Sequence, residues 1–446
     1  MTVLSIGQLG YPSHNWFNLN DADLMPGLLG ADYRFRLAPG ETVQETINLR
    51  LHGTAPELRA ILNVLEGLAS PQTGLARALP SAPYCLCYWN EAENRFFYSR
   101  LLSLNLGSLP AHLPAAERGA LSLELLIIRE NHWESDPVLL TLANTGGGTS
   151  TGLTLFNHDD TSPGHDNWCL TTTSGLGLVQ PSPLKLEITN LAASPDLGDL
   201  YVGMFNLMGG GTIPNFTFEA ENGSSGTKIT STNASGSAYS QLAWSGNAWT
   251  TLTSWTINPT DLTTCANRVL LPILRFFSVP SEANLELRLT LSTNGNLVYQ
   301  SPSFLMPSAQ DYLPLSPFHL PAGVLPLEVE ALSHVLTLQA RLPGAGAHSL
   351  DLDYLLLLPR DGFAHFQSVA GLPQNAILLD DSYLNLTWSR SGSYELATHT
   401  RAGSPLNLLP GSETRLYFFQ SDGANLSPIT RAIKVKASYR LRRQMP

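Results

Sequence analysis

The chain has 446 residues, of which 43% are hydrophobic and only 14% charged, and its formal net charge is −11 at pH 7. Because soluble proteins carry about 25% charged residues, so low a fraction is typical of a surface that other chains cover. The acidic balance argues against nucleic-acid binding through a basic surface, and the chain lacks the apolar run of roughly 18 residues that a membrane helix needs.

The N-terminal segment 1–39 is rich in turn residues and carries Trp16 and Phe17 among polar neighbours. Glycine and proline favour turns over regular elements, so we expect an arm or a long loop rather than a core. The segment has no basic stretch followed by an apolar run, and we therefore expect no cleaved export signal. At this length the chain should hold about two to four domains.

Residues 42–51 alternate apolar and polar side chains, which is the period of a half-buried strand. The period then changes over 54–69, the one stretch with a convincing helical pattern. Thr54 is placed as the N-cap, and Pro56 and Glu57 suit the first turn of a helix.

One apolar stripe runs along this predicted helix and consists of Leu58, Ile61, Leu62, Leu65 and Leu68. Burial of such a stripe is worth on the order of 8–15 kcal/mol, so the helix must lie on a sheet or on a neighbouring subunit. We assign candidate assembly contacts to Leu58, Ile61, Leu62 and Leu65.

The cysteines are Cys85, Cys87, Cys169 and Cys265. Cys85 and Cys87 lie two apart in a strand-like run, so they share a face, point in parallel and are badly placed to bond each other. A zinc site would need a matching pair of Cys or His, and none has the spacing. We expect buried free thiols in a reducing compartment.

Two further strands are predicted at 84–89 and 95–106, and a hairpin is the simplest account of the pair. Another strand is predicted at 121–129. The run 145–149 is rich in glycine, so we place the first domain boundary there.

A strand, an amphipathic helix, a hairpin and then a strand that ends in Arg129-x-x-x-Trp133-Glu134 resemble the opening domain of tail proteins from long-tailed bacteriophages, the tube and distal-tail class. Residues 408–418, followed by 433–441, resemble the closing strands of such proteins.

This resemblance covers residues 1–150 and 375–446, and it implies one split domain. Members of the class stack as rings with a shared β-barrel around a channel, and the helix packs on the outside of the sheet. The resemblance would place Arg440, Arg442 and Arg443 at an interface or facing the lumen. A solvated charged end is the alternative.

Residues 151–213 are predicted as a connecting β region, with strands at 153–156 and 184–188. The loop 157–166 gathers His and Asp, the residue types of a metal site. Neither helical spacing nor a known loop register supports such a site. We favour an ordinary polar turn, because Asp, Ser, Pro and Gly commonly form turns.

Residues 216–223 contain Glu219-Ala220-Glu221 and resemble the first strand of carbohydrate-binding modules that begin with Glu-Ala-Glu and fold as a β-jelly-roll. Later segments keep that module's order, at 236–239, 244–247, 268–279, 285–292 and 348–358. The resemblance spans 214–360 and implies an inserted jelly-roll domain.

The two glutamates pose an electrostatic problem. In an alternating strand Glu219 and Glu221 share a face about 7 Å apart, so they repel unless a cation or hydrogen-bond donors lie between them. The resemblance implies that they hold a structural Ca²⁺ with Asp353, or Asp351, from the last strand, and Ca²⁺ accepts such oxygen ligands. Solvated acidic residues at a strand end are the alternative. We expect no other cofactor.

Trp244, Trp249 and Trp255 lie in a stretch of Ser, Thr, Asn and Gly. Sugar binding needs a flat apolar face and short polar side chains for the hydroxyls. Trp244 and Trp249 are therefore candidate carbohydrate-binding residues. Packing in a core is the alternative for each tryptophan.

The search for an enzyme finds neither H-E-x-x-H nor G-x-x-x-x-G-K. A glycosidase could use two carboxylates without a local motif, and the pairs to consider are Asp159/Asp160, Glu219/Glu221 and Asp380/Asp381. Because sequence neighbours rarely face each other across a sugar, we expect no enzyme.

The sequence therefore predicts a mainly β protein, with a split tail-tube-like β-sandwich or barrel domain that carries one amphipathic helix, plus an inserted β-jelly-roll. We predict a structural virion protein of a phage tail, forming rings in the tail tube or at the distal tail and baseplate, with the jelly-roll outward for stability or host-surface adhesion. Its partners would be its own copies, neighbouring tail proteins and host-surface glycans, and it would assemble in the host cytoplasm. A free-standing lectin is the alternative, and a glycoside hydrolase comes after it.

Overall fold

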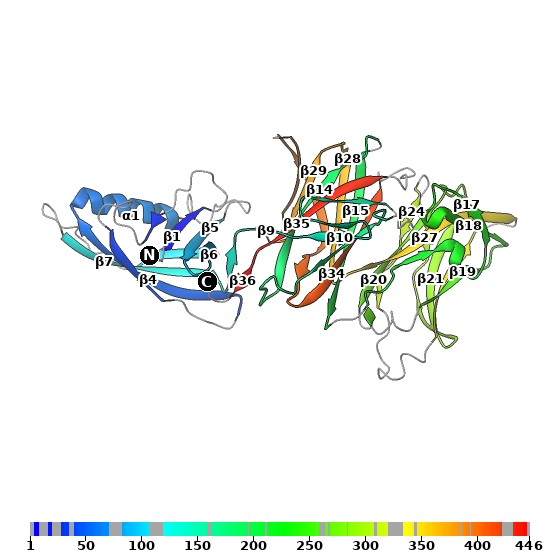
Figure 1. The fold of residues 1–446 in the computed structure, drawn as a ribbon, viewed down its shortest axis with the longest axis horizontal. Helices are drawn as coiled ribbons and strands as arrows, with labels where there is room; N and C mark the ends of the chain where they lie inside the picture. The colour runs from blue at the N-terminus through cyan, green and yellow to red at the C-terminus, as the bar shows by residue number, and fades with distance from the viewer. Residues whose placement is uncertain are drawn as a thin grey trace. The chain divides into compact units, whose positions relative to one another are not determined.

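The computed structural model divides into two compact units (Figure 1). Unit 1 comprises residues 1–138, 177–182 and 440–446, and unit 2 comprises 139–176 and 183–439. The structure describes residues 4–8, 17–19, 28–34, 40–70, 83–107, 119–157, 163–194, 196–209, 212–257, 264–265, 268–282, 284–306, 310–319, 333–342, 346–383, 386–392, 394–421 and 431–443.

Unit 1 is built on an antiparallel sheet with strands from both ends of the chain. Its order is β2 (Phe17–Asn18), β1 (Leu4–Gln8), β5 (Tyr84–Asn90), β6 (Arg95–Leu106), β7 (Gly119–Glu130), β4 (Thr42–Gly53) and β3 (Leu28–Tyr33). Two short strands complete it, because β8 (Trp133–Ser135) pairs with β6 and with β36 (Arg442–Arg443). The predicted hairpin of β5 and β6 is confirmed.

The prediction of an arm over 1–39 is wrong for the described residues of that segment. β1, β2 and β3 belong to the sheet, and Ile6 and Leu19 are buried in its core. Of the glycines and prolines that favoured a loop, Gly7 and Gly30 lie within β1 and β3, and the others stand between the short strands in the sequence. Turn residues at this spacing therefore delimit strands rather than exclude them.

α1 (Ala55–Ala69) begins where the sequence predicted, and Figure 1 shows it along one face of the sheet. Thr54 donates its backbone N–H and its hydroxyl to Glu57 Oε2 at 2.8 and 3.0 Å, which secures the first turn. The helix packs on β4 and β6 of its own unit through the buried side chains Leu58, Ile61, Leu62 and Leu65. Their assignment to assembly is therefore corrected, because the same chain already covers them.

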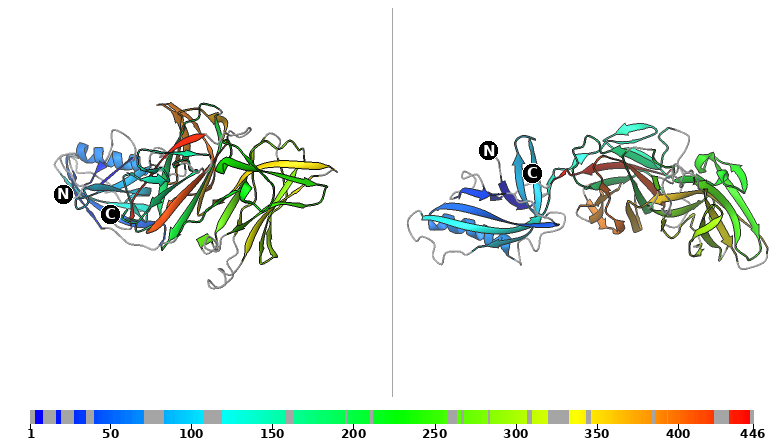
Figure 2. Two further views of the ribbon diagram at one scale, coloured as in Figure 1. Left: turned by 45° about the vertical axis from the view of Figure 1, so that its right-hand side comes forward. Right: turned by 90° about the horizontal axis from the view of Figure 1, so that it is seen from below.

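Unit 2 contains two β-sandwiches, seen from two directions in Figure 2. We call the first, residues 139–176, 183–208 and 362–439, the scaffold sandwich. One sheet has the order β11 (Gly147–Thr149), β10 (Leu142–Asn144), β13 (Trp168–Thr172), β34 (Ser412–Ser421), β15 (Leu197–Met208), β28 (Gly362–Leu372) and β32 (Thr400–Ser404). The other has β12 (Leu153–Phe156), β35 (Ala432–Tyr439), β14 (Ser182–Asn190), β29 (Ile377–Asp381), β30 (Leu386–Ser391) and β31 (Tyr394–Thr398), with β9 (Val138–Leu139) and β33 (Asn407–Leu408) attached to β35 and β14.

The domain boundaries differ from the prediction in two places. Residues 375–446 were expected to close the first domain, but β34 and β35 pair with strands of the scaffold sandwich, and only β36 returns to unit 1. An alternating strand pattern fixes which face is buried and leaves open which sheet the strand joins. The glycine run 145–149 forms the β10–β11 hairpin, and the units divide at 138/139 instead.

The second sandwich of unit 2, which we call the insert, is formed by the strands between Thr217 and Pro359. One sheet has the order β17 (Thr227–Thr230), β18 (Ala238–Ser245), β27 (Ala347–Pro359), β20 (Val269–Phe276) and β24 (Tyr312–Pro314), with β16 (Thr217–Glu219) on β27 and β25 (Phe318–His319) on β20. The other has β19 (Thr250–Ile257), β26 (His334–Arg341), β21 (Glu286–Thr293) and β22 (Asn296–Gln300), with β23 (Phe304–Leu305) on β21. The prediction of a mainly β fold with sandwich-like domains and one amphipathic helix is confirmed, and the described sheets form no closed barrel.

The insert and the scaffold sandwich share one hydrophobic core. β15 approaches β27 so closely that a Cβ on Gly203 would lie 2.5 Å from Leu358 Cγ and 2.6 Å from Pro359 O. Tyr354 OH, from the insert, donates to Asn157 O of the scaffold sandwich at 2.8 Å. Unit 2 therefore packs as a single body, and the glycine makes the close approach of the two strands possible.

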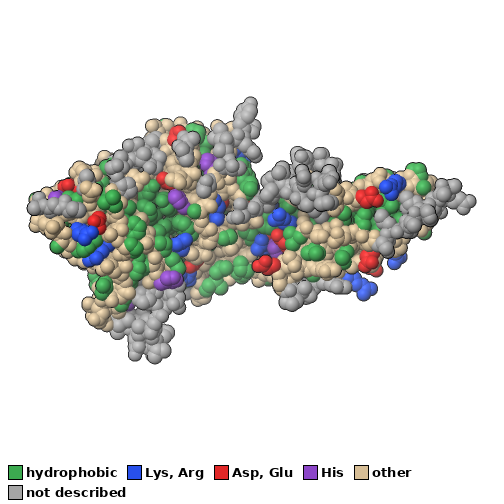
Figure 3. All heavy atoms as spheres, turned by 180° about the vertical axis from the view of Figure 1, so that it is seen from behind, with side chains coloured by type: hydrophobic (Ala, Val, Ile, Leu, Met, Phe, Trp, Pro, Cys, Tyr) green, Lys and Arg blue, Asp and Glu red, His purple; other side chains and the backbone are tan. Residues whose placement is uncertain are grey.

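The surface is poor in charge, and Figure 3 shows red and blue side chains scattered among hydrophobic and uncharged ones on the face it presents. No helix within the described ranges is long and apolar enough to cross a membrane. The prediction of buried free thiols is confirmed for all four cysteines. Burial raises the pKa of the Cys87 thiol to about 12, so this thiol is unreactive at neutral pH.

Candidate functional site

The motif Arg129-x-x-x-Trp133-Glu134 supplies the polar interior of unit 1. Arg129 donates from Nε and Nη2 to Glu45 at 2.6 and 2.9 Å, and neither side chain is exposed. The Arg129 guanidinium carbon lies 4.8 Å from the centroid of the buried Trp133 ring. Tyr33 OH also donates to Glu45. Each residue of this motif therefore has a structural role that the sequence pattern did not reveal.

The C-terminal arginines close unit 1. Arg442 Nε donates to Glu134 Oε1 at 2.6 Å, and Arg443 pairs with Glu93. Arg440 Nη1 donates to a backbone carbonyl of β8 at 3.3 Å. These partners within unit 1 give the arginines a structural role, and the expectation that they lie at an interface or face a lumen stays a prediction.

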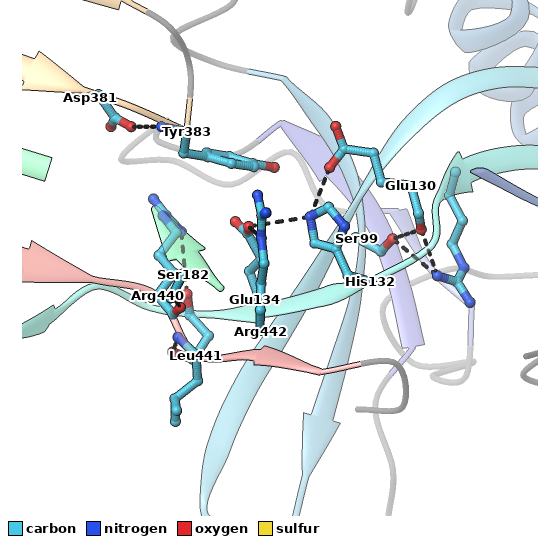
Figure 4. A network of polar contacts seen from close by, with 12 residues as sticks. Ser99, Glu130, His132, Glu134, Ser182, Asp381, Tyr383, Arg440, Leu441 and Arg442 are labelled. Carbon is cyan, nitrogen blue, oxygen red and sulfur yellow. Dashed lines mark hydrogen bonds and ion pairs between the residues drawn. The ribbon is translucent and has the colours of Figure 1, made fainter. Parts of the chain in front are cut away.

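His132 lies between two carboxylates in the same region (Figure 4). Its Nε2 is 3.2 Å from Glu130 Oε2 and 3.3 Å from Glu134 Oε1. Burial alone would lower the pKa of His132, but the hydrogen bonds to both carboxylates outweigh it and raise that pKa. Burial alone would raise the pKa of Glu134, but His132 and Arg442 outweigh it and lower that pKa. His132, Glu130, Glu134 and Arg442 therefore form a charged cluster in unit 1, and this cluster favours the protonated form of His132.

The acidic pair of the insert is held by a turn rather than by an alternating strand. β16 ends at Glu219, and a 3₁₀ turn follows over Ala220–Asn222. Glu219 and Glu221 nevertheless both reach Gly236, where a Cβ would lie 2.9 Å from Glu221 Oε1 and 3.4 Å from Glu219 Cδ. Gly236 has a φ of 57°, a backbone conformation that favours glycine. The two carboxylates therefore come together, but by a different local structure from the predicted one.

Asp353, the third predicted ligand, is fully buried on β27 and pairs with Arg275 of β20. Its Oδ1 accepts the backbone N–H of Ser235 at 2.9 Å, and Ser235 Oγ donates to Glu219 Oε1 at 2.8 Å. Asp351, the alternative ligand, accepts a serine hydroxyl at 2.9 Å on the exposed surface. Ser235 therefore links Asp353 to Glu219 by hydrogen bonds, and the acidic side chains do not converge on one position where an ion could bind.

This arrangement does not fit a Ca²⁺ site made of Glu219, Glu221 and Asp353. The Arg275 guanidinium already compensates the charge of Asp353. Among the described residues no group of three or more His, Cys, Asp or Glu side chains could hold a metal ion. The prediction that Glu219, Glu221 and Asp353 together bind Ca²⁺ is therefore corrected. Cation binding by Glu219 and Glu221, of which Glu221 has its pKa raised by burial, stays a prediction.

The two tryptophans assigned to sugar binding lie in different environments. Trp244 is 6% exposed and belongs to the shared core of unit 2, because alternation along β18 turns it inward. A buried ring has no face for a sugar, so its assignment is wrong. Trp249 is half-buried, and its ring centroid lies 4.1 Å from the guanidinium carbon of Arg288 and 5.0 Å from that of Arg341. Its role in sugar binding stays a prediction.

The carboxylate pairs considered for hydrolysis have structural surroundings where they are described. Asp380 is buried, accepts the Thr387 hydroxyl at 2.8 Å and lies 2.9 Å from Arg401 Nε. Asp380 and Asp381 are consecutive on β29 and therefore point to opposite faces of the strand. The remaining pair, Asp159/Asp160, lies outside the described residues.

Sequence reasoning missed one catalytic spacing. Residues 148–152 read Gly-Thr-Ser-Thr-Gly, which has the G-x-S-x-G spacing of a nucleophile elbow, and a simple motif scan would have found it. Such an elbow requires a sharp turn from a strand into a helix. Here the run passes from β11 towards the next strand, β12. The structural context that would make Ser150 a nucleophile is therefore not met.

Sequence reasoning also missed a lysine-bearing face of mixed charge on the scaffold sandwich, where Glu187 lies opposite Lys436. Three of the chain's four lysines lie on it: Lys434 and Lys436 on β35, and Lys185 on the neighbouring β14. The residues between them along β35 are buried, so the lysines project outward. Lys185 Nζ lies 5.6 Å from the Trp388 ring centroid. The spacing of Lys434 and Lys436 within a strand pattern was the available signal.

Comparisons with known proteins give no family. No family model matches the chain, and no curated protein matches it. Among solved structures, the infectious bursal disease virus VP2 subviral particle aligns at 12% identity over 68% of this chain and 78% of that one, with a TM-score of 0.19. An exo-beta-1,3-galactanase from Phanerochaete chrysosporium with galactose aligns at 13% identity over 79% and 95%, with a TM-score of 0.20. At TM-scores this low, neither alignment carries an argument about function.

Proposed function

We propose that the chain is a structural virion protein of a phage tail, which assembles into rings in the tube or at the distal tail and displays the insert outward. The observation that carries this proposal is the organisation of unit 1. Its sheet has α1 packed on one face, and β36 from the C-terminal end closes it through Arg442 and Glu134. The helix on the sheet agrees with one part of the arrangement that the tail-protein resemblance implies, and Glu134 belongs to the motif on which the resemblance rests, whereas β34 and β35 belong to the scaffold sandwich.

The position of the insert supports display. It leaves the scaffold sandwich after β15 and returns at β28, and these two strands are antiparallel neighbours in one sheet. An insertion at such a point leaves the pairing of the supporting sheet intact. The scaffold sandwich therefore serves as a base for the insert, whose contribution we propose to be stability and adhesion to host-surface glycans.

We assign contact between copies of the chain to the lysine-bearing face of the scaffold sandwich. Lys185, Lys434 and Lys436 project outward from a chain whose net charge is −11. Glu187 lies opposite Lys436 on this face, so the face offers both signs of charge to a second copy. Self-assembly through this face would also account for a chain so poor in charge elsewhere.

Negative-stain imaging and mass measurement of the full chain test the proposal, and we expect rings or short tubes. The double variant Lys434→Glu/Lys436→Glu should lower the assembled fraction. The matched control is Lys228→Glu, which changes the one remaining lysine, exposed on β17 of the insert, and should leave assembly unchanged. A monodisperse monomer at every concentration would overturn the ring proposal.

A free-standing carbohydrate-binding protein is the second candidate. It is favoured by the half-exposed Trp249 on the outer face of the insert, where arginine and amide side chains surround it. Glycan binding by a monomeric chain would support this candidate over the first.

A further inference from the structure

The outer face of the sheet β19-β26-β21-β22 brings an indole and two guanidinium groups together. Arg288 on β21 and Arg341 on β26 alternate with buried residues of the core, so both project outward. Gln339 lies opposite Arg288 in the register of the two strands. Trp249 comes just before β19, and both guanidinium groups lie close to its ring, at 4.1 and 5.0 Å from the centroid.

The two arginines differ in how their charge is compensated. Arg341 Nη2 donates to both carboxylate oxygens of Glu286, each at 2.7 Å. Arg288 Nε donates at 2.7 Å to Oε1 of the neutral Gln339, and no carboxylate pairs with Arg288 among the residues that the structure describes. Burial and the like charge of Arg341 lower the pKa of Arg288. A carboxylate brought to Arg288 would therefore supply the missing countercharge and could accept two parallel hydrogen bonds.

The surroundings indicate what kind of molecule carries that carboxylate. Thr251 lies opposite Gln339, and Ser254 lies opposite Thr337, so short polar side chains line this outer face. A flat aromatic ring beside such groups suits the C–H face and the hydroxyls of a sugar.

We propose that this face binds a glycan that contains uronic acid. The Arg288 guanidinium pairs with the sugar carboxylate, a pyranose ring stacks on Trp249, and Gln339 contacts a hydroxyl. The inference rests on the proposed adhesive role of the insert and specifies the class of glycan that the insert would take.

Titration calorimetry of the full chain tests this inference with oligogalacturonides, oligoglucuronates and alginate oligosaccharides, each beside its neutral methyl ester. We expect at least one acidic oligosaccharide to bind more tightly than its ester, and more weakly as salt rises. Arg288→Gln should weaken binding of the acid by about 10- to 100-fold, the equivalent of one charge-assisted hydrogen bond, with little change for the ester. Trp249→Ala should weaken both, and Trp249→Phe should keep part of the affinity.

Lys228→Gln, on the other sheet of the insert, is the matched control and should bind as the parent chain does. Melting curves of each variant establish that the insert remains folded. The inference is overturned if no acidic oligosaccharide binds, if acid and ester bind equally, or if Lys228→Gln loses as much affinity as Arg288→Gln. Rings that bind no uronate would overturn this inference alone, whereas a monomer that binds uronate through Arg288 would overturn only ring assembly.

Discussion

Arg129 and Glu45 form a two-point ion pair, with Arg129 Nε 2.6 Å from Glu45 Oε2, although neither side chain has any exposed surface. Each of these buried charges is stabilised by the other, because an unpaired ion in this position has no water to solvate it. The pair joins β4 to β7, the strands with the longest register in unit 1.

Glu45→Gln should therefore destabilise unit 1 by about 3–5 kcal/mol, since it leaves the buried Arg129 charge uncompensated. Urea unfolding monitored by tryptophan fluorescence measures the change. The control is Glu66→Gln, which removes an exposed partner 3.9 Å from Arg59 and should cost less than about 1 kcal/mol. Equal costs for the two variants would show that the Arg129–Glu45 pair is not the structural centre of the unit.

Leu62→Asp should unfold unit 1, because Leu62 is 2% exposed in the contact of α1 with the sheet and a carboxylate there has no partner. Arg59→Asp lies on the solvent side of the same helix, with a side chain 57% exposed, and should be tolerated. Circular dichroism and limited proteolysis compare the two variants. Similar tolerance of both would contradict the packing of the helix.

Gly203→Val should destabilise unit 2 by about 1–3 kcal/mol, because the added Cβ would lie 2.5 Å from Leu358 Cγ and the packed strands have no space for it. Gly67→Ala is the opposite case, since nothing lies within 4 Å of a Cβ on Gly67 of α1. That variant should stabilise unit 1 by about 0.5–1 kcal/mol. Thermal unfolding distinguishes the expected loss of stability from the expected gain. A Gly203→Val variant as stable as the parent chain would mean that β15 and β27 are less closely packed.

The His132 cluster predicts a pH dependence for unit 1. Folding raises the pKa of His132, so its contribution to stability is complete below about pH 6.5, the unfolded value, and is lost as pH rises through the folded value. Folding lowers the pKa of Glu134, so that contribution is present above about pH 4.5 and is lost on acidification.

Urea unfolding of the parent chain should therefore show unit 1 to be more stable at pH 6 than at pH 8. His132→Gln should flatten this decline, whereas His52→Gln, on β4 of the same unit, should retain it. A parent chain with the same stability at both pH values would rule out a charged His132 as a stabilising group.

Several features could be predicted from sequence because they depend on residues close together in the chain. The stripe that begins at Leu58 and the cap at Thr54 identify α1, since both operate within a few helical turns. Glycine and proline signals were less decisive, and over 1–39 they concealed β1, β2 and β3. For the sugar site, sequence proposed two tryptophans of equal standing, although only Trp249 remains accessible.

The sequence by itself determined the mainly β class, the position of α1 and the buried thiols, because period and composition act locally. The tertiary structure alone decided that β34 and β35 join the scaffold sandwich, that Arg275 compensates Asp353, and that Arg288 lies beside Trp249 with no carboxylate partner among the described residues. These relationships join residues far apart in the chain, and an alternating pattern specifies a buried face without specifying the partner that covers it.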